Sequence, residues 1–356
     1  MKSIDAKDYY IHFSDNAYLQ LNNFLKNGNF SKIIILTDSN SKKYCLDIFK
    51  SKVSKHISKS ILAINIDNGE ENKNISTCVS VWDSLKNLET DRHSLVINLG
   101  GGVVTDLGGF VASTYMRGIT YINIPTTLLS MVDASIGGKT GVDLSGLKNL
   151  IGLITNPAMV VVDPIYLQTL PIVELKSGFS EMIKHSLISN ERNWLKLQTN
   201  NINNFYAGEC FYRSINIKND IVINDPMEFG HRKILNFGHT IGHAVESFYL
   251  TSNLHKTKTH GECIAVGMVL ESYISMKIKN LSINKCKNIK NYILSLYDKV
   301  KLNEFEKLKI VELLQYDKKN KEGVIKFVLL NDIGSVSYDN IVSLDVIMES
   351  FDYYLS

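Results

Sequence analysis

Short runs of apolar residues alternate with helical patterns in the first half of the chain. Five of these runs predict buried β-strands, at residues 31–37, 59–66, 94–99, 119–124 and 159–163. Helical periodicity occupies residues 40–51, 75–88 and 106–116. Because strands that alternate with helices are typical of a parallel sheet, the pattern predicts an α/β domain over residues 1–170.

The pattern changes after Pro171, where helical periodicity dominates. Apolar residues at helical spacing predict helices over 172–189, 202–223, 234–249, 261–279, 285–299 and 343–355. One apolar run, 324–330, predicts a strand that pairs with 334–337. We therefore expect a mainly α-helical second domain over residues 171–356. No repeat or low-complexity linker separates the two halves, so we expect them to share an interface and a ligand-binding cleft.

Composition narrows the class of protein. The chain has 356 residues, of which 44% are hydrophobic, enough for two domains with cores of their own. The first ten residues contain no apolar signal segment, and no run approaches the length of a membrane helix, so we expect a soluble cytoplasmic protein. The five cysteines are far apart and never form CxxC, which argues for reduced thiols. A net charge of +3 from scattered lysines does not indicate a nucleic-acid surface, so we expect a small-molecule partner.

Three of the nine histidines lie close together in the second half. His239 and His243 are four residues apart in a predicted helix, and His260 follows in His-Gly-Glu. Residues at that spacing project from one helix face about 6 Å apart. Two imidazoles there either both bind one metal ion or divide the work, one as ligand and one as proton-transfer group. The cluster predicts a metal site, although the spacing of His239 and His243 by itself also fits two partly exposed helical histidines.

Three consecutive glycines follow the predicted strand 94–99. Gly100, Gly101 and Gly102 form a turn whose backbone can approach a ligand closely, and the helix expected over 106–116 could hold a pyrophosphate at its amino end. The spacing differs from GxGxxG, so the common dinucleotide motif is absent. A tight turn without a ligand is the alternative.

Nine motifs occur in order along nearly the whole chain and together resemble the 3-dehydroquinate synthase family. They are Gly-Gly-Gly-Val-Val-Thr-Asp (100–106), Tyr-Met-Arg-Gly (115–118), Pro-Thr-Thr-Leu-Leu (125–129), Asp133 with Gly-Gly-Lys-Thr-Gly (137–141), Lys148-Asn149, Ser-Gly-Phe-Ser-Glu-Met-Ile-Lys (177–184), Arg232 with Leu-Asn-Phe-Gly-His-Thr-Ile-Gly-His (235–243), His-Gly-Glu (260–262) and Asp-Lys-Lys (317–319). The resemblance implies a Rossmann-like NAD-binding domain followed by a mostly helical metal- and substrate-binding domain.

The resemblance also implies a reaction. Members of this family convert 3-deoxy-D-arabino-heptulosonate 7-phosphate into 3-dehydroquinate and phosphate, in the shikimate pathway of aromatic amino acid biosynthesis. They use NAD and a divalent metal, zinc or cobalt. NAD oxidises a substrate hydroxyl, phosphate is eliminated, the same cofactor returns the hydride, and an intramolecular aldol step closes the ring. The protein is expected to hold the reactants in one geometry, and the family resemblance implies a homodimer.

The resemblance assigns residues to the metal and the substrate. Glu181, His239 and His260 correspond to the metal ligands, and His243 corresponds to a proton-transfer group. Cations for the substrate carboxylate and phosphate, together with polar groups of the same site, are Lys139, Lys184, Lys218, Arg232, Lys318, Asn236 and Asp133, with Arg117 reaching in from another subunit. His255 competes with His260 as a ligand, but the Gly-Glu that follows His260 favours His260.

The resemblance also assigns a cofactor site to the first half. Asp38, at the end of a predicted strand, is placed to meet a ribose. Glu70 and Lys73 match a Gly-Glu-x-x-Lys element, although an ordinary surface pair is the alternative there. The remaining NAD contacts are Gly100, Gly101, Gly102, Asp106, Thr126, Thr127, Lys148 and Asn149.

Three other functions compete with this interpretation. Another sugar phosphate cyclase would share fold, cofactor and metal ligands, but Leu235, Asn236 and His243 match the dehydroquinate synthase type. A metal-dependent polyol dehydrogenase would release NADH and would not need the cluster of cations. A catalytically inactive homologue would have lost a ligand or His243, and all of these are present.

Overall fold

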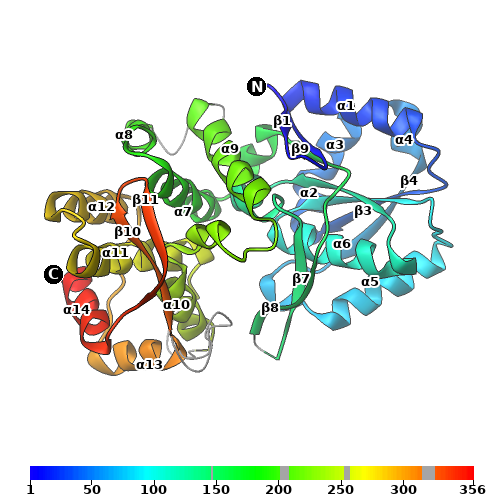
Figure 1. Cartoon of the computed structure of the whole chain (residues 1–356). Helices are drawn as coiled ribbons and strands as arrows, with labels where there is room; N and C mark the ends of the chain where they lie inside the picture. Colours follow the sequence, from blue (N-terminus) through cyan, green and yellow to red (C-terminus); the bar gives the residue numbers. More distant parts are fainter. Residues whose placement is uncertain (146, 201–207, 252–256, 315–324) are drawn as a thin grey trace. The chain divides into compact units, whose positions relative to one another are not determined.

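The computed structural model describes residues 1–145, 147–200, 208–251, 257–314 and 325–356. The chain divides into two compact units, Met1–Pro171 and Ile172–Ser356 (Figure 1). Each unit has its own sheet or hairpin and its own helices, so each is described by itself.

The first unit is built on a seven-stranded sheet. Its strand order is β1-β2-β9-β6-β5-β3-β4, and neighbouring strands pair in parallel except β1 with β2, which are antiparallel. A separate antiparallel hairpin, β7 with β8, belongs to the same unit. The strands are β1 Ile4–Asp5, β2 Tyr10–Phe13, β3 Ile33–Asp38, β4 Ile61–Ile66, β5 Leu95–Gly100, β6 Thr120–Pro125, β7 Lys139–Leu144, β8 Leu147–Ile154 and β9 Met159–Val162.

Helices cover both faces of this sheet. Figure 1 shows α1, α3 and α4 on one side and α5 and α6 on the other. Ile34, Leu36 and Val96 of the sheet pack with α5 and α6 in one apolar cluster. All six residues of β5 are buried, as expected for a central parallel strand covered on both faces. The helical segments are α1 Ser14–Asn27, α2 Ser39–Tyr44, α3 Leu46–Lys52, α4 Lys55–Ser60, η1 Glu70–Asn72, α5 Ile75–Asn87, α6 Gly102–Thr114, η2 Tyr115–Arg117, η3 Ser130–Ala134 and η4 Pro164–Thr169.

Two helix predictions in this unit need correction. The helix expected over 40–51 is two helices, α2 and α3. Cys45 lies between them and is the C-cap of α2 and the N-cap of α3. The helix expected from residue 106 already begins at Gly102, so the glycine turn supplies the first turn of α6. Its leading amides are therefore those of the glycines themselves.

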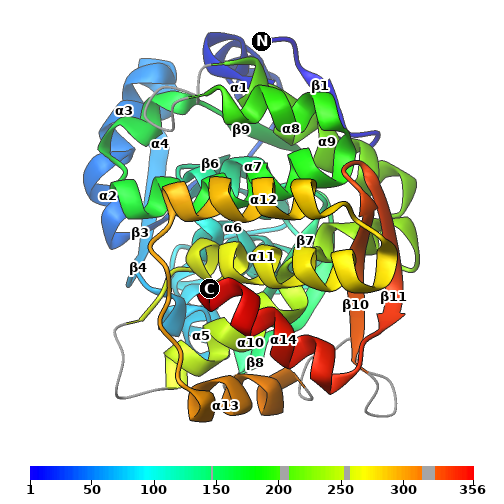
Figure 2. The ribbon, with the colours of Figure 1, turned by 90° about the vertical axis from the view of Figure 1, so that its left-hand side faces the viewer.

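The second unit is mainly helical, as predicted. Helix α11 is its centre and contacts α7, α10, α12, α14 and β10; Figure 2 shows it lying between α12 and α14. The elements are α7 Ile172–Ser189, α8 Glu191–Gln198, α9 Glu209–Asn224, η6 His231–Asn236, α10 His239–Thr251, α11 His260–Lys279, α12 Ile283–Leu296, α13 Glu304–Leu314, β10 Lys326–Asp332, β11 Ser335–Ile341 and α14 Leu344–Leu355. The helix expected from residue 234 starts only at His239, after the separate η6 turn.

Glycines bring α10 and α11 into backbone contact. A Cβ on Gly267 would lie 2.0 Å from the carbonyl oxygen of Gly238 and 2.7 Å from the nitrogen of Gly242. Gly238 also has a φ of +78°, which other residues rarely adopt. No side chain fits between the two helices at this crossing. The contact therefore fixes the beginning of α10 against the middle of α11.

The structure confirms the predicted fold class, an α/β domain with a parallel sheet followed by a mostly helical domain. Among the described residues, no helix combines the length and the apolar character that crossing a membrane requires. No disulfide joins the cysteines, all five of which lie in the described part of the chain.

Candidate metal centre and cofactor site

Four side chains of the second unit converge on one point. His239 Nε2 and His260 Nε2 each lie 3.5 Å from the same carboxylate oxygen, Oε1 of Glu181. The ligand atoms of His239, His243 and His260 all lie within 4.8 Å of one another. Glu181 is fully buried in α7. One carboxylate and two or three imidazoles in this arrangement form a donor set suited to a divalent metal.

Close packing at His-Gly-Glu brings α11 to α7. A Cβ on Gly261 would lie 2.2 Å from the carbonyl oxygen of Ser177, one turn before Glu181, and Gly261 N donates to Ser177 Oγ at 3.1 Å. Glu262 closes a capping box with Thr259, which starts α11 at His260. Gly261 and Glu262 therefore position His260 beside Glu181. Both residues belong to the His-Gly-Glu motif of the sequence, but the contact of Gly261 with Ser177 could not be predicted from that motif.

Both metal-facing imidazoles have their other ring nitrogen held. His239 Nδ1 donates to the carbonyl oxygen of Phe237 at 3.1 Å, and His260 Nδ1 lies 3.3 Å from Oε2 of Glu246. A hydrogen on Nδ1 leaves Nε2 with its lone pair, the form that binds a metal. The two rings are therefore oriented with Nε2 toward Glu181.

The electrostatic surroundings of the two histidines differ. Burial, followed by the charge of Lys184, holds the pKa of His239 well below its ordinary value. Burial also lowers the pKa of His260, but Glu246 and Glu181 outweigh burial and raise that pKa to about 10. His260 is therefore a site where a metal ion and a proton compete for one nitrogen.

Cations predicted to bind substrate are buried in the same unit. Lys184 forms an ion pair with Glu181, one turn earlier on α7. Lys218 on α9 and Arg232 in η6 are 6% and 2% exposed, and α7, α9 and η6 pack against one another. Solvated surface charges would be far more exposed. The burial therefore argues against a mere surface role for these two cations.

The turn before α10 is supported by residues that sequence reasoning missed. Asp225 accepts backbone hydrogen bonds from Phe229, Gly230 and Arg232. The side-chain amide nitrogen of Asn236 donates a hydrogen bond to Oε1 of Glu228 at 2.7 Å and therefore points toward Glu228. No spacing in the sequence pairs these groups, because each contact depends on the course of an irregular turn.

The predicted cofactor site lies at the carboxyl edge of the parallel sheet in the first unit. The strand order reverses between β3 and β5, and such a switch point is where open α/β sheets bind ligands. Asp38 ends β3, and Gly100 ends β5. One oxygen of Asp38 accepts from the amide of Ser41 and thereby caps α2. The other carboxylate oxygen of Asp38 takes no part in this cap.

Lys73 lies at the centre of a charged cluster in this unit. Its Nζ is 2.6 Å from Oδ2 of Asp106 and 2.6 Å from Oδ1 of Asn149. Lys148 pairs with Glu70 at 3.2 Å. Burial lowers the pKa of Lys73, but Asp106 and Glu70 outweigh burial and raise it. Five residues predicted to bind NAD are thus brought together, and Lys73 is buried, unlike a lysine of an ordinary surface pair.

Replacing Lys73 by methionine is expected to reduce the free energy of unfolding by about 3 kcal/mol, because the variant leaves Asp106 without its buried cation. Urea unfolding followed by circular dichroism measures the change. Lys148→Met is the matched control, since its ion pair is partly exposed and is expected to contribute less than about 1 kcal/mol. Equal losses in the two variants would contradict a special role for the Lys73 cluster.

Models of one enzyme family match the chain over most of its length. The model described as 3-dehydroquinate synthase N-terminal matches residues 63–177, and the one described as 3-dehydroquinate synthase C-terminal matches residues 178–320. The chain belongs to the 3-dehydroquinate synthase family.

Relatives within this family cover most of the chain. A 3-dehydroquinate synthase of Parabacteroides distasonis is 38% identical over 94% of this chain and 94% of its own length. One from Pyrococcus abyssi is 38% identical over 87% of this chain and 90% of its own. These proportions leave no large part of the relative without a counterpart.

Solved structures show the same fold. A 2-deoxy-scyllo-inosose synthase, crystallised with carbaglucose-6-phosphate, NAD⁺ and Co²⁺, has a TM-score of 0.83 at 24% identity and covers 98% of both chains. A 2-epi-5-epi-valiolone synthase from Streptomyces hygroscopicus, with NAD⁺ and Zn²⁺ bound, has a TM-score of 0.81 at 22% identity, covering 100% of this chain and 99% of its own. At these identities the likeness concerns the fold alone.

Other predicted site residues come from turns and short elements. Arg117, Asp133 and Lys139 lie in the first unit, where Arg117 has a left-handed backbone with a φ of 67°. Thr126 N donates to Gly100 O at 2.9 Å, and Thr127 shares a hydrogen bond with Ser130. Lys318 and the competing ligand His255 lie outside the described residues.

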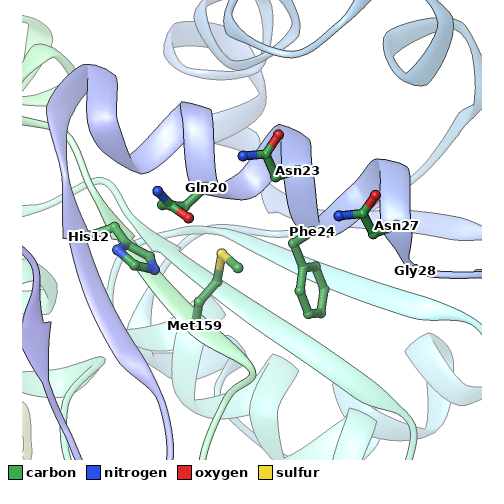
Figure 3. Close-up of a pocket in the computed structure, with 7 residues that line it drawn as sticks. All are labelled: His12, Gln20, Asn23, Phe24, Asn27, Gly28 and Met159. Carbon is green, nitrogen blue, oxygen red and sulfur yellow. The ribbon is translucent and has the colours of Figure 1, made fainter.

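A pocket lies elsewhere, against α1 (Figure 3). It has a volume of about 430 Å³ and is lined by His12, Gln20, Asn23, Phe24, Asn27, Gly28 and Met159. None of these is a predicted site residue of the family. His12 is 8% exposed, and its Nδ1 hydrogen-bonds to Ser3 Oγ at 2.7 Å. His185 is fully buried, and its Nδ1 hydrogen-bonds to Ser214 Oγ at 2.8 Å.

Proposed function

We propose that this protein is a 3-dehydroquinate synthase, a carbon–oxygen lyase that converts 3-deoxy-D-arabino-heptulosonate 7-phosphate into 3-dehydroquinate and phosphate. The observation that carries the proposal is that His239 and His260 both direct Nε2 at one oxygen of Glu181, in a chain of this family. The proposal includes dependence on NAD and on a divalent metal.

The metal ligands in this proposal are Glu181, His239 and His260. Two imidazoles present Nε2 to one buried carboxylate, and three protein ligands leave open positions for substrate oxygens, as catalytic zinc sites require. When bound, zinc or cobalt supplies a Lewis acid that lowers the pKa of a coordinated hydroxyl. The choice between zinc and cobalt is left to measurement.

The NAD site in this proposal is the glycine turn with the Lys73 cluster. A Cβ on Gly102 would meet only Ala134 within 4 Å, at an ordinary 3.5 Å, so packing alone does not require glycine there. Space above the first turn of α6 suits a pyrophosphate, which the leading amides would bind. When bound, NAD accepts a hydride from the substrate and returns it within the same turnover.

Residues of the chain hold charge and move the proton. His243 lies on the face of α10 that carries His239, with ring centroids 5.2 Å apart, and is the proposed base for the substrate hydroxyl. Lys184, Lys218 and Arg232 are proposed to bind the carboxylate and phosphate of the substrate. Because these cations are buried, their attraction for anions is stronger than it would be in water.

Phosphate release from 3-deoxy-D-arabino-heptulosonate 7-phosphate tests this proposal. Zinc-loaded protein with catalytic NAD is expected to release phosphate and form 3-dehydroquinate without lasting absorbance at 340 nm, because the hydride returns to the product. Lasting NADH would instead favour a polyol dehydrogenase. Failure to release phosphate, with metal and NAD bound, would contradict the proposed substrate. A homodimer and a cytoplasmic location are further parts of the proposal, drawn from the family.

A further inference from the structure

Glu246 occupies a position that the proposed reaction does not use. It follows His239 and His243 on α10 at positions i, i+4 and i+7, so all three side chains project from one helix face. Its side chain is 5% exposed, and its Oε2 lies 3.3 Å from Nδ1 of His260 on α11. A buried carboxylate thus connects one metal-binding helix to the imidazole of the other.

The contact is made on the side of the ring that faces away from Glu181. His260 Nε2 is 3.5 Å from Glu181, whereas Nδ1 faces Glu246. An ionised carboxylate only accepts hydrogen bonds, so this contact requires a hydrogen on Nδ1. The ring is then fixed with Nε2 available for a metal.

The corresponding partner of His239 is different in charge. His239 Nδ1 donates to a neutral backbone carbonyl, that of Phe237, at 3.1 Å. A carboxylate polarises an imidazole more strongly than a carbonyl does and makes the opposite nitrogen a better donor. The partner of His239 is a backbone group, whereas the partner of His260 is a side chain. Only the partner of His260 can therefore be removed by a substitution.

The geometry points to Glu246 as a positioning residue of the metal centre, which orients His260 and strengthens its Nε2 as a ligand. This inference rests on the proposed metal site. It does not require the proposed substrate, because it concerns metal binding alone. Glu246 acts through His260 and does not itself contact the ion.

Metal affinity of the full-length protein tests the inference. Zn²⁺ binding, measured by competition with a chromophoric chelator, is expected to weaken about 10-fold in Glu246→Gln and about 100-fold in Glu246→Ala, the range found for such partners of metal-bound histidines. The visible absorption spectrum of bound Co²⁺ is expected to shift, because His260 is less firmly oriented. A purely structural role would lower the melting temperature of the metal-free protein without moving that spectrum.

Glu312→Gln is the matched control. It removes the same charge from the same unit at an exposed position on α13, where Glu312 pairs with Lys309, and is expected to leave Zn²⁺ affinity unchanged. Zn²⁺ affinities of both Glu246 variants within twofold of the wild type, with an unchanged Co²⁺ spectrum, would overturn the inference. So would a wild-type protein that takes up neither ion. Normal metal binding without phosphate release would instead overturn the proposed reaction and leave the role of Glu246 standing.

Discussion

Replacing His260 by alanine is expected to leave the purified protein with far less than one equivalent of metal and to lower kcat/KM by about three orders of magnitude or more. Loss of the imidazole removes one of three proposed ligands, and the proposed reaction depends on a Lewis acid that would contribute several kcal/mol to the transition state. Its neighbours Glu181 and Glu246 are then left as buried carboxylates without the imidazole between them.

Metal content by atomic absorption, measured together with phosphate release, checks this expectation. His231→Ala is the control, because His231 is an exposed histidine of the same unit outside the cluster. A His260 variant that retains a full equivalent of metal would transfer the ligand role to another imidazole, His243 or His255. Loss of metal from the His231 variant would mean that the assay reports general damage to the unit.

Replacing His243 by alanine is expected to have a different effect, with metal retained and kcat lowered about 10²- to 10⁴-fold, the usual contribution of a general base. Metal content is the measurement that distinguishes a base from a ligand here, because the ligand atoms of His243 lie within 4.8 Å of those of His239 and His260. The proposal gives His243 the proton and gives the ion to its two neighbours with Glu181.

Single-turnover kinetics and metal analysis separate these roles. Added imidazole is expected to restore part of the rate in His243→Ala, because it can replace a missing base without rebuilding a ligand sphere. Loss of metal from this variant would show instead that His243 is a ligand, and the site would then contain three imidazoles and one carboxylate.

The grouping of the three histidines could be predicted from the sequence, because their positions follow simple rules. His239 and His243 are brought to one side by the helical repeat alone, and His260 starts a helix in a motif that determines its direction. Glu181 needed the family resemblance, since nothing in its own helix distinguishes it from other acidic residues. The role of each residue stays a prediction that the proposed variants test.

Other features depend on contacts that no local pattern contains. In the sequence, no neighbouring residue indicates a partner for Glu246 or Glu271. In the structure, Glu246 contacts His260, and Glu271 accepts backbone hydrogen bonds from Gly238 and Ile241 at the start of α10. Each depends on the close approach of α10 to α11. The β7–β8 hairpin was also missed, because β8 is largely exposed and lacks the buried alternation by which strands are recognised.

Helix boundaries failed for a related reason. The start of α6 was placed at residue 106, because three glycines indicate a turn and have low helix propensity. In the structure Gly101 caps the helix and Gly102 begins it. Tertiary packing overcomes the weak propensity, since α6 contacts β5, β6 and β7 along its length.

The glycine contact between α10 and α11 also determines when the metal centre can form. Glu181 is distant in the sequence from the two histidines, which lie on consecutive helices, and the three residues meet only after α7, α10 and α11 have docked. Closing such long loops costs chain entropy before any ligand is in place. In a zinc finger the ion can organise a short peptide. Here Glu181 lies outside any such short segment, and on the ribosome the site becomes complete only after His260, at the start of α11, has emerged.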